Sequence, residues 1–250
     1  MLGSNHRHSR HVAIVRETLV RHLACTLLVT CAILPQIAAA EDALVPVEKA
    51  AFHHPIFHNE YVLLLDVYVP PNRGGPMYHT HSLDQVSVLI ADSDMTNQLW
   101  GGEATPPRRG MRGNVGFAAN SKKPVSHRGF NVGSTPFHNI VMALLKNEPY
   151  GLSAGTRTSA PSYAQVLDNE RVRAWKISLE PGEAVPAITQ TAPGTRIVLD
   201  GGEITEYVPG DPDRGKMLRT GQYFWQDAGV TRAVRNTGTT KVQFVEIELK

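Results

Sequence analysis

The stretch "NEYVLLLDVYVPPNRGGP" at residues 59–76 decides the fold, because the chain contains it twice. It aligns without gaps to "NERVRAWKISLEPGEAVP" at residues 169–186, an offset of 110. Self-similarity at a fixed spacing indicates a duplicated structural unit. Glu60 and Glu170 match, which favours a turn or pairing role over chemistry. The identical pairs are Asn59/Asn169, Glu60/Glu170, Val62/Val172, Pro71/Pro181 and Pro76/Pro186.

A second match lies further along the chain, at an offset of 105. "VSHRGFNVGST" at residues 125–135 aligns to "VTRAVRNTGTT" at residues 230–240, and Gly116 aligns to Gly221. The change of offset falls in loops, where insertions are tolerated. The stretch between the copies, residues 147–164, is rich in Gly, Ser, Thr and Pro and is predicted to be a linker.

The fold class predicted from the pattern of apolar runs is all-β. Short β-branched and aromatic runs such as "YVLLLDVYV" (61–69) and "VQFVEIEL" (242–249) are separated by Gly, Pro, Asn and Asp. No long amphipathic helix stands out after residue 41. This pattern is typical of a β-sandwich or β-barrel. We predict one barrel over residues 41–146 and a second over residues 165–250.

Residues 1–40 have the pattern of an export signal. A basic start is followed by the apolar run "LACTLLVTCAILPQIAAA" and by small residues that fit a cleavage site before Glu41. A signal anchor and a lipoprotein attached at Cys31 are the alternatives. We expect a periplasmic or secreted protein, with no membrane span after cleavage. Cys25 and Cys31 both lie in this segment, so the mature chain would hold no thiolate.

The charge distribution argues against a nucleic-acid partner. The net charge is +2, and the basic and acidic residues are interspersed without a Lys/Arg block. A small molecule and a second copy of the chain are the partners that we consider instead.

Three histidines are candidate metal ligands. His79 and His81 stand two apart, so on a strand both side chains point to the same face. His127 lies on a later predicted strand, before the turn "NVGST", and in a small barrel it can reach the same interior. At the two offsets the second copy replaces the imidazoles, so the scaffold does not require them. The aligned pairs are His79/Thr189, His81/Thr191, Gln85/Thr195 and His127/Arg232.

Converging neutral imidazoles predict a mononuclear site for one divalent transition metal from the set Fe, Mn, Ni, Cu and Zn. The chain resembles a two-domain cupin (bicupin) with a degenerate second domain. The first motif of that family appears as Gly74, His79-Thr80-His81 and Gln85, and the second as Gly116, Pro124 and His127-Arg-Gly-Phe-Asn131. The resemblance implies two tandem, jelly-roll-like β-barrels, with the metal in the first.

Gln85 stands where the cupin pattern implies a glutamate. An amide oxygen is a neutral and weaker ligand, so Gln85 is either a weak fourth ligand or a hydrogen-bond partner of a ligating histidine. Asp84 would reach the site only through a bulge. A site without a carboxylate leaves the metal charge uncompensated, which favours a small organic anion as substrate.

Several other residues are interpreted as structural. We favour a hydrogen-bonded, structural Arg232 in the second barrel over an anion-binding one. Surface or edge positions are expected for His53, His54 and His58, and an outward-facing strand position for His138. Core positions are expected for Trp175, Trp225 and Phe224.

Two function classes remain open. The first is a metal-dependent enzyme, and three-histidine cupins that the site resembles include thiol and gentisate-type dioxygenases. The second is a non-catalytic periplasmic protein that binds or senses a small molecule or metal. No general acid or base is assigned, because Glu60 and Asp84 have no established geometry.

Overall fold

The computed structural model describes residues 44–157 and 162–250 of the 250-residue chain. The predicted export signal over residues 1–40 and part of the predicted linker lie outside the described residues. Within the described ranges, no helix is long and apolar enough to cross a membrane.

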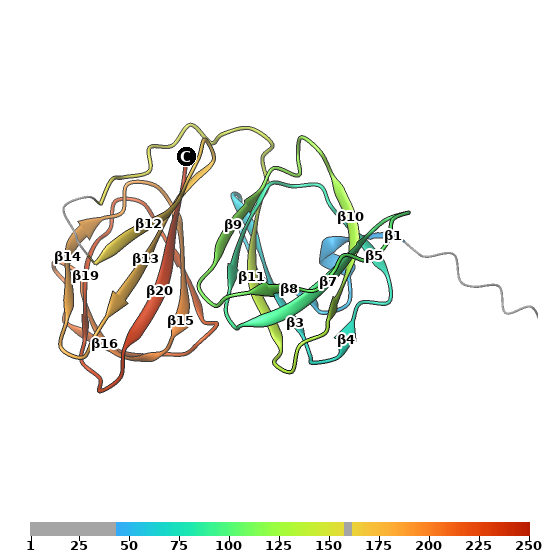
Figure 1. Ribbon diagram of the computed structural model, residues 1–250. Coiled ribbons are helices and arrows are strands. Elements are labelled where there is room, and N and C mark those ends of the chain that lie inside the picture. Colours follow the sequence, from blue (N-terminus) through green and yellow to red (C-terminus); the bar gives the residue numbers. More distant parts are fainter. Residues whose placement is uncertain (1–43, 158–161) are drawn as a thin grey trace, which may run out of the picture. The chain divides into compact units, whose positions relative to one another are not determined.

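The first half of the described chain forms two sheets that face each other (Figure 1). One sheet has the strand order β1-β5-β10-β7-β8, with β4 paired to β10, and the other has the order β2-β3-β11-β6-β9. A single turn of 3-10 helix, Val47–Lys49, follows β1. The strands are β1 (Leu44–Pro46), β2 (His53–His58), β3 (Val62–Val69), β4 (Arg73–Gly74), β5 (Tyr78–His81), β6 (Gln85–Leu89), β7 (Ser93–Leu99), β8 (Arg108–Gly110), β9 (Val115–Ala118), β10 (Val125–Asn131) and β11 (Phe137–Leu144).

The second half repeats this arrangement. Its sheets have the orders β12-β13-β20-β15-β18 and β14-β19-β16-β17. The prediction of an all-β chain with two jelly-roll-like barrels is confirmed. The strands are β12 (Tyr163–Asp168), β13 (Val172–Leu179), β14 (Ala184–Thr189), β15 (Gly194–Asp200), β16 (Gly202–Tyr207), β17 (Arg214–Leu218), β18 (Tyr223–Gln226), β19 (Thr231–Asn236) and β20 (Val242–Leu249).

The residues that match between the copies make the same hydrogen bonds. The Asn131 side chain donates to the carbonyls of Val69 and Thr135, at 3.0 and 2.8 Å. The Asn236 side chain donates to the carbonyls of Leu179 and Thr240, at 2.9 and 2.8 Å. Both amide oxygens then accept the backbone N–H two residues later, at 3.0 Å. These buried amides join the end of β10 to the end of β3, and the end of β19 to the end of β13. This shared role explains why the sequence keeps them in both copies.

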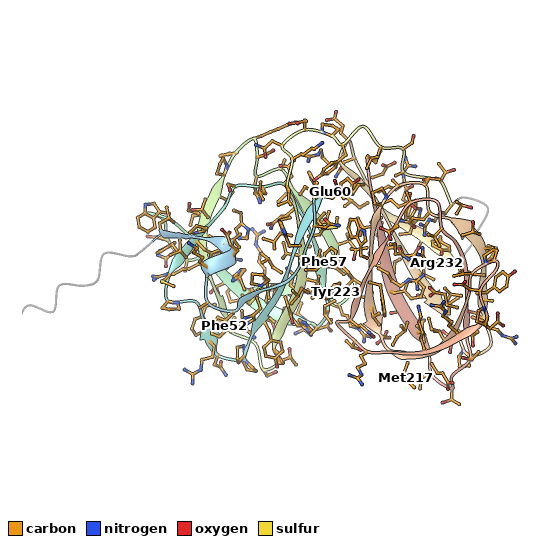
Figure 2. All side chains as sticks on the ribbon, turned by 180° about the vertical axis from the view of Figure 1, so that it is seen from behind. Phe52, Phe57, Glu60, Met217, Tyr223 and Arg232 are labelled. Atoms are coloured by element: carbon orange, nitrogen blue, oxygen red, sulfur yellow. The ribbon has the colours of Figure 1, made fainter. Side chains whose placement is uncertain are left out.

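The two barrels share one apolar cluster. Side chains on the outer faces of β3, β6 and β11 pack with those of β13, β15 and β20 in a single group of buried residues. Leu64 and Met142 of the first barrel and Ile197 and Ile247 of the second are fully buried there. The rings of Phe57 and Tyr223 approach from the two sides, with centroids 6.0 Å apart (Figure 2). The sheet β2-β3-β11-β6-β9 and the sheet β12-β13-β20-β15-β18 are therefore each covered on both faces.

Polar contacts fix the register of this interface. Asp84 is 2% exposed and accepts hydrogen bonds from the backbone and side chain of Ser121, at 2.9 and 2.7 Å. Its other oxygen binds the guanidinium of Arg171, which belongs to the second barrel and is itself buried. Tyr223 donates its hydroxyl to the Ile56 carbonyl at 2.6 Å. Asp84 is thus an interface residue, and its carboxylate is already used.

Replacing Arg171 by Gln is expected to lower the free energy of unfolding by about 3–5 kcal/mol, because it leaves the Asp84 carboxylate buried and uncompensated. Arg109→Gln is the matched control, since Arg109 pairs with Asp94 at 2.9 Å with its side chain 55% exposed. That change should cost no more than about 1 kcal/mol. Urea denaturation of both variants measures the difference, and equal losses would contradict the assignment.

Candidate metal centre

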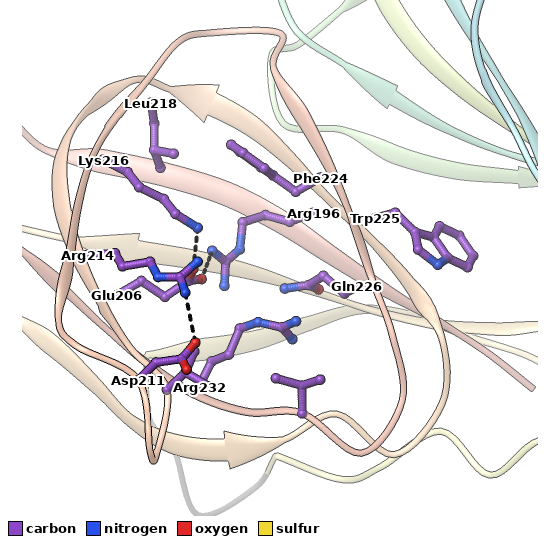
Figure 3. Close-up of a pocket in the computed structure, with 12 residues that line it drawn as sticks. Arg196, Glu206, Asp211, Arg214, Lys216, Leu218, Phe224, Trp225, Gln226 and Arg232 are labelled. Atoms are coloured by element: carbon purple, nitrogen blue, oxygen red, sulfur yellow. Dashed lines mark hydrogen bonds and ion pairs between the residues drawn. The ribbon is translucent and has the colours of Figure 1, made fainter.

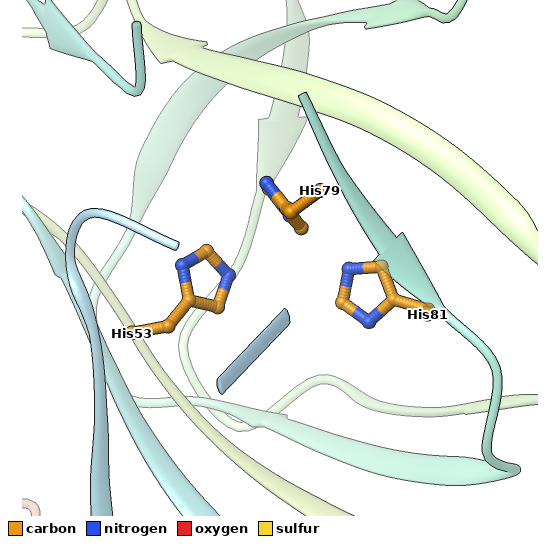
Figure 4. A group of neighbouring side chains, drawn as sticks. All are labelled: His53, His79 and His81. Carbon is orange, nitrogen blue, oxygen red and sulfur yellow. The ribbon is translucent and has the colours of Figure 1, made fainter. Parts of the chain in front are cut away.

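Four histidines of the first barrel meet in its interior. His79 and His81 are the inward-facing residues of β5 and are 5% and 7% exposed, respectively. β10 pairs antiparallel with β5 so that His127 lies directly opposite His79. His53, at the start of β2, approaches from the other sheet (Figure 4). A strand pair therefore supplies three imidazoles, and the facing sheet supplies the fourth.

The rings lie within contact of one another. The His79 ring centroid is 4.5 Å from that of His53, 5.0 Å from that of His81 and 4.6 Å from that of His127. The ligand atoms of His53, His79 and His81 all lie within 4.8 Å of one another. The His81 and His127 Nε2 atoms are 3.1 Å apart. This group has the side chains needed to hold a metal ion.

Hydrogen bonds outside the cluster determine which ring nitrogen faces inward. His53 Nδ1 donates to the Ala51 carbonyl at 3.0 Å. His81 Nδ1 lies 2.8 Å from Gln85 Oε1, and His127 Nδ1 lies 3.1 Å from Asn97 Oδ1. With these oxygens as acceptors, each Nδ1 carries the hydrogen and each Nε2 keeps its lone pair.

Burial keeps the imidazoles uncharged at neutral pH. Desolvation is the largest cause of the lowered pKa of every one of them, and the neighbouring histidines lower it further. The pKa is lowered to about 2 for His79 and to about 4 for both His81 and His127. The pKa of His53 is lowered as well. Neutral imidazole is the form that binds a metal.

The donor arrangement fits a bound cation. Two Nε2 lone pairs 3.1 Å apart repel each other unless a positive charge lies between them. Imidazole nitrogens bind transition metals at about 2.0–2.1 Å, which places two adjacent ligands on one ion roughly 3 Å apart. His79 Nε2 is buried and has no hydrogen-bond partner among the described residues. A buried polar atom without a partner is costly, and a metal bond would satisfy it.

Gln85 acts through His81. Its amide oxygen accepts the His81 Nδ1 hydrogen bond, so of the two roles considered for Gln85 the structure shows the hydrogen-bond partner. Asn97 holds His127 in the same way and was not anticipated from the sequence. Such partners fix the ring orientation and raise the basicity of the ligating nitrogen.

His53 corrects one sequence-based expectation, since we expected a surface or edge position for it and it lies within the cluster. Its neighbours His54 and His58 on β2 are exposed, as expected. Extending the 110-residue offset backwards aligns His53 with Tyr163, so this imidazole too occurs only in the first copy. His54 also has no histidine counterpart in the second copy, so the repeat alone does not distinguish His53 from His54. Only the pairing of β2 with β3 does so.

His138 lies apart from the cluster. Its Nε2 pairs with Asp66 Oδ1 at 2.9 Å, and its ring packs against Tyr68. Trp175 is a core residue of the second barrel, as expected. Trp225 stacks on Phe57 at the interface, with ring centroids 5.6 Å apart.

The alignment of the second copy is wrong by one residue around the site. Arg232 lies opposite Ile188 and Thr231 opposite Thr189, whereas His127 lies opposite His79. The cause is that the first copy has one residue more between Gly74 and His79 than the second has between Ala184 and Ile188, opposite strands that are otherwise in the same register. By strand register the equivalent pairs are His53/Tyr163, His79/Ile188, His81/Gln190, Gln85/Gly194 and His127/Arg232.

Gly194 shows that the second barrel differs from the first at the position of Gln85. A Cβ atom on Gly194 would lie 1.8 Å from the Ile247 carbonyl oxygen, so no side chain equivalent to Gln85 fits there. The second barrel retains the fold without any of the four imidazoles.

Comparisons with known proteins agree on the fold. No family model and no curated protein sequence matches the chain. Among solved structures, AerE from Microcystis aeruginosa is 15% identical with a TM-score of 0.52, covering 80% of this chain and 98% of that one. The chain has a two-barrel cupin fold. The expected resemblance to the bicupins is confirmed at this level.

Two enzymes share the bicupin fold at lower identity. Salicylate 1,2-dioxygenase from Pseudoaminobacter salicylatoxidans is 12% identical with a TM-score of 0.51, covering 75% of this chain and 71% of that one. Oxalate decarboxylase from Lactobacillus farciminis is 10% identical with a TM-score of 0.51, covering 76% and 77%, respectively. These likenesses establish the architecture of the bicupin and leave its chemistry to the site.

We expect Gln85→Ala to weaken binding of a divalent transition metal by about 10–100-fold, because His81 loses the partner that orients it. His54→Gln is the matched control, since its side chain is exposed on the same strand as His53 and should leave the affinity unchanged. Competition with a chromophoric chelator measures both. Equal affinities for Gln85→Ala and the unaltered protein would remove Gln85 from the site.

The metal-free protein should lose stability in acid through these histidines. Their pKa values are lowered in the fold, so below about 6.5 the unfolded chain binds more protons and the free energy of unfolding falls as the pH drops towards 4. Each such histidine contributes at most about 1.4 kcal/mol per pH unit. Chemical denaturation at pH 7, 6 and 5 should show a shallower loss for His81→Gln than for His58→Gln. Parallel losses would contradict the buried, neutral assignment.

Proposed function

We propose that the protein is an exported, metal-dependent cupin enzyme of the dioxygenase type that acts on a small organic anion. The observation that carries the proposal is the convergence of neutral imidazoles whose Nε2 lone pairs face one another in the first barrel. The buried His79 Nε2, which has no hydrogen-bond partner among the described residues, supports the same proposal.

The residues of the site have separate roles in this proposal. His53, His79 and His81, whose ligand atoms all lie within 4.8 Å of one another, hold the metal, and His127 adjoins them with its Nε2 3.1 Å from that of His81. Gln85 and Asn97 keep the Nδ1 hydrogens outward, so that the Nε2 lone pairs stay available. A redox-active divalent metal bound here would supply the electrons for dioxygen chemistry, and a redox-inert one would supply Lewis acidity.

The charge of the site favours an anionic substrate. No carboxylate of a described residue hydrogen-bonds to any of the four imidazoles, and none is among the causes of their pKa shifts. Asp84, the nearest in sequence, is held by Arg171. A divalent ion with neutral ligands retains its full charge, and an organic anion compensates it. The names of two similar structures give salicylate and oxalate as the substrates of those enzymes, and both are small carboxylates.

A non-catalytic protein that binds or senses a small molecule is the second candidate. The absence of a carboxylate from the site favours it, because such a site offers no general acid or base beside the metal. In this case the metal would hold the anion without turnover.

Dioxygen uptake separates the two candidates. The purified protein is loaded anaerobically with Fe(II) and given a panel of hydroxybenzoates, catechols and hydroxy acids. Uptake with one member of the panel, reduced at least 100-fold in His79→Ala and unchanged in His54→Ala, supports the enzyme. Ligand-dependent thermal stabilisation of the metal-loaded protein without uptake supports the sensor. A protein that binds no divalent metal contradicts both.

Export is tested separately by sequencing the amino terminus of the protein recovered from cells. A mature chain that starts near Glu41 supports it, and an intact residue 1 contradicts it.

A further inference from the structure

The second barrel has a charged cavity at the place of the metal centre. By strand register Tyr163, Ile188, Gln190 and Arg232 stand where the first barrel has its four histidines. All four line one small interior cavity, which is continued by a larger one around Arg232. The position that holds imidazoles in one barrel therefore holds a guanidinium in the other.

The buried glutamates of this barrel already pair with basic side chains. Glu246 accepts from Arg196 at 2.9 and 2.7 Å and also pairs with Arg157. Glu206 accepts from Arg196 at 3.0 Å and pairs with Lys216 through its other oxygen. Both carboxylates thus use both oxygens. Deeper in the barrel Glu248 pairs with Arg157 and with the Thr191 hydroxyl, the latter at 3.1 Å.

Arg232 is left out of this network. No hydrogen bond or ion pair joins its guanidinium to another residue of the described chain, so the structural role that we favoured, a hydrogen-bonded guanidinium, is wrong. Its pKa is lowered, first by burial, and Arg196 lowers it further, against raising effects of Glu206, Glu246 and Asp227. A half-buried cation of this kind lacks the partner that usually accompanies it.

Gln226 adds a second unpartnered group. It is 4% exposed, and its side-chain oxygen has no hydrogen-bond partner among the described residues. Its amide nitrogen lies 3.5 Å from Glu246 Oε1, which leaves the oxygen for a donor from elsewhere. Arg232 and Gln226 line both cavities, and their side chains turn towards the same space in Figure 3.

The size and the lining of the larger cavity indicate the kind of ligand that fits it. Its volume is about 260 Å³, just below the range of about 300–1,000 Å³ that is usual for ligand pockets, so it fits only a small molecule. Apolar side chains, including Phe224 and Leu218, form part of the wall, so Phe224 is a lining residue as well as a core one. The basic residues outnumber the acidic ones, since the lining holds Arg196, Arg214, Lys216 and Arg232 against Glu206 and Asp211.

We propose that the second barrel binds a small hydroxycarboxylate that has an apolar body. The carboxylate pairs with Arg232, the hydroxyl donates to the Gln226 side-chain oxygen, and the apolar part lies along Phe224 and Leu218. A guanidinium suits this task because its planar donors match a carboxylate. The site is separate from the histidine cluster and does not depend on the proposed enzyme activity.

The test uses the full-length, metal-free protein and three related probes, mandelate, phenylacetate and 1-phenylethanol, in isothermal titration calorimetry. Mandelate is expected to bind with one equivalent per chain. Phenylacetate, which lacks the hydroxyl, and 1-phenylethanol, which lacks the carboxylate, should each bind at least tenfold more weakly. Sulfate tests for a site that accepts any anion, and sulfate binding as tight as that of mandelate would overturn the proposal.

Matched variants locate the site. Arg232→Gln should weaken mandelate binding at least tenfold, while Arg235→Gln, an exposed arginine on the same strand, should not change it. Gln226→Met should bring mandelate down to the affinity of phenylacetate. His79→Ala should leave mandelate binding intact, which separates this site from the proposed metal centre.

Thermal unfolding tests whether the Arg232→Gln variant is still folded. Arg232→Gln removes a guanidinium that has no described hydrogen bond to lose, so its Tm should equal or exceed that of the unaltered protein. Mandelate should raise the Tm of the unaltered protein and of Arg235→Gln, and should leave that of Arg232→Gln in place. Absent mandelate binding, unchanged binding in Arg232→Gln or lost binding in His79→Ala would each overturn the proposal.

Discussion

The shared apolar cluster between the barrels is the contact on which the remaining structure depends. Strands β11 and β20 lie at the centre of their sheets and face the barrel interior on one side and the other barrel on the opposite side. Most of their residues are consequently buried, and in β20 these include the ion-paired Glu246 and Glu248. Neither sheet could expose that face to water without a large loss of hydrophobic stabilisation. The duplication is thus a structural requirement as well as a record in the sequence.

The same scaffold encloses two interiors that differ in charge. In the first barrel the interior is neutral, and desolvation keeps four imidazoles uncharged and able to bind a cation. In the second barrel glutamates and arginines compensate one another around the corresponding place, with Arg232 in excess. An anion that meets a metal in one barrel would meet a guanidinium in the other.

Much of the site was predictable from residue spacing, and the limits of that prediction have a physical origin. The His-x-His spacing places both side chains on one face of a strand, and the size of a small barrel lets His127 reach the same interior. His53 was missed because the sequence does not say which residue of β2 lies opposite Val67 of β3. The aligned threonines of the second copy were wrong because the first copy has one residue more than the second just before the site, and a shift of one residue reverses the face of each side chain.

The sequence by itself determined the all-β class, the duplication and the presence of a histidine group in one copy, because each of these follows from composition and spacing along the chain. The tertiary structure decided the fourth histidine, the role of Gln85 as the partner of His81, the use of Asp84 at the interface and the isolation of Arg232. These depend on which residues face one another across sheets. That pairing is set by bulges and packing between segments distant in the chain, which no local pattern records.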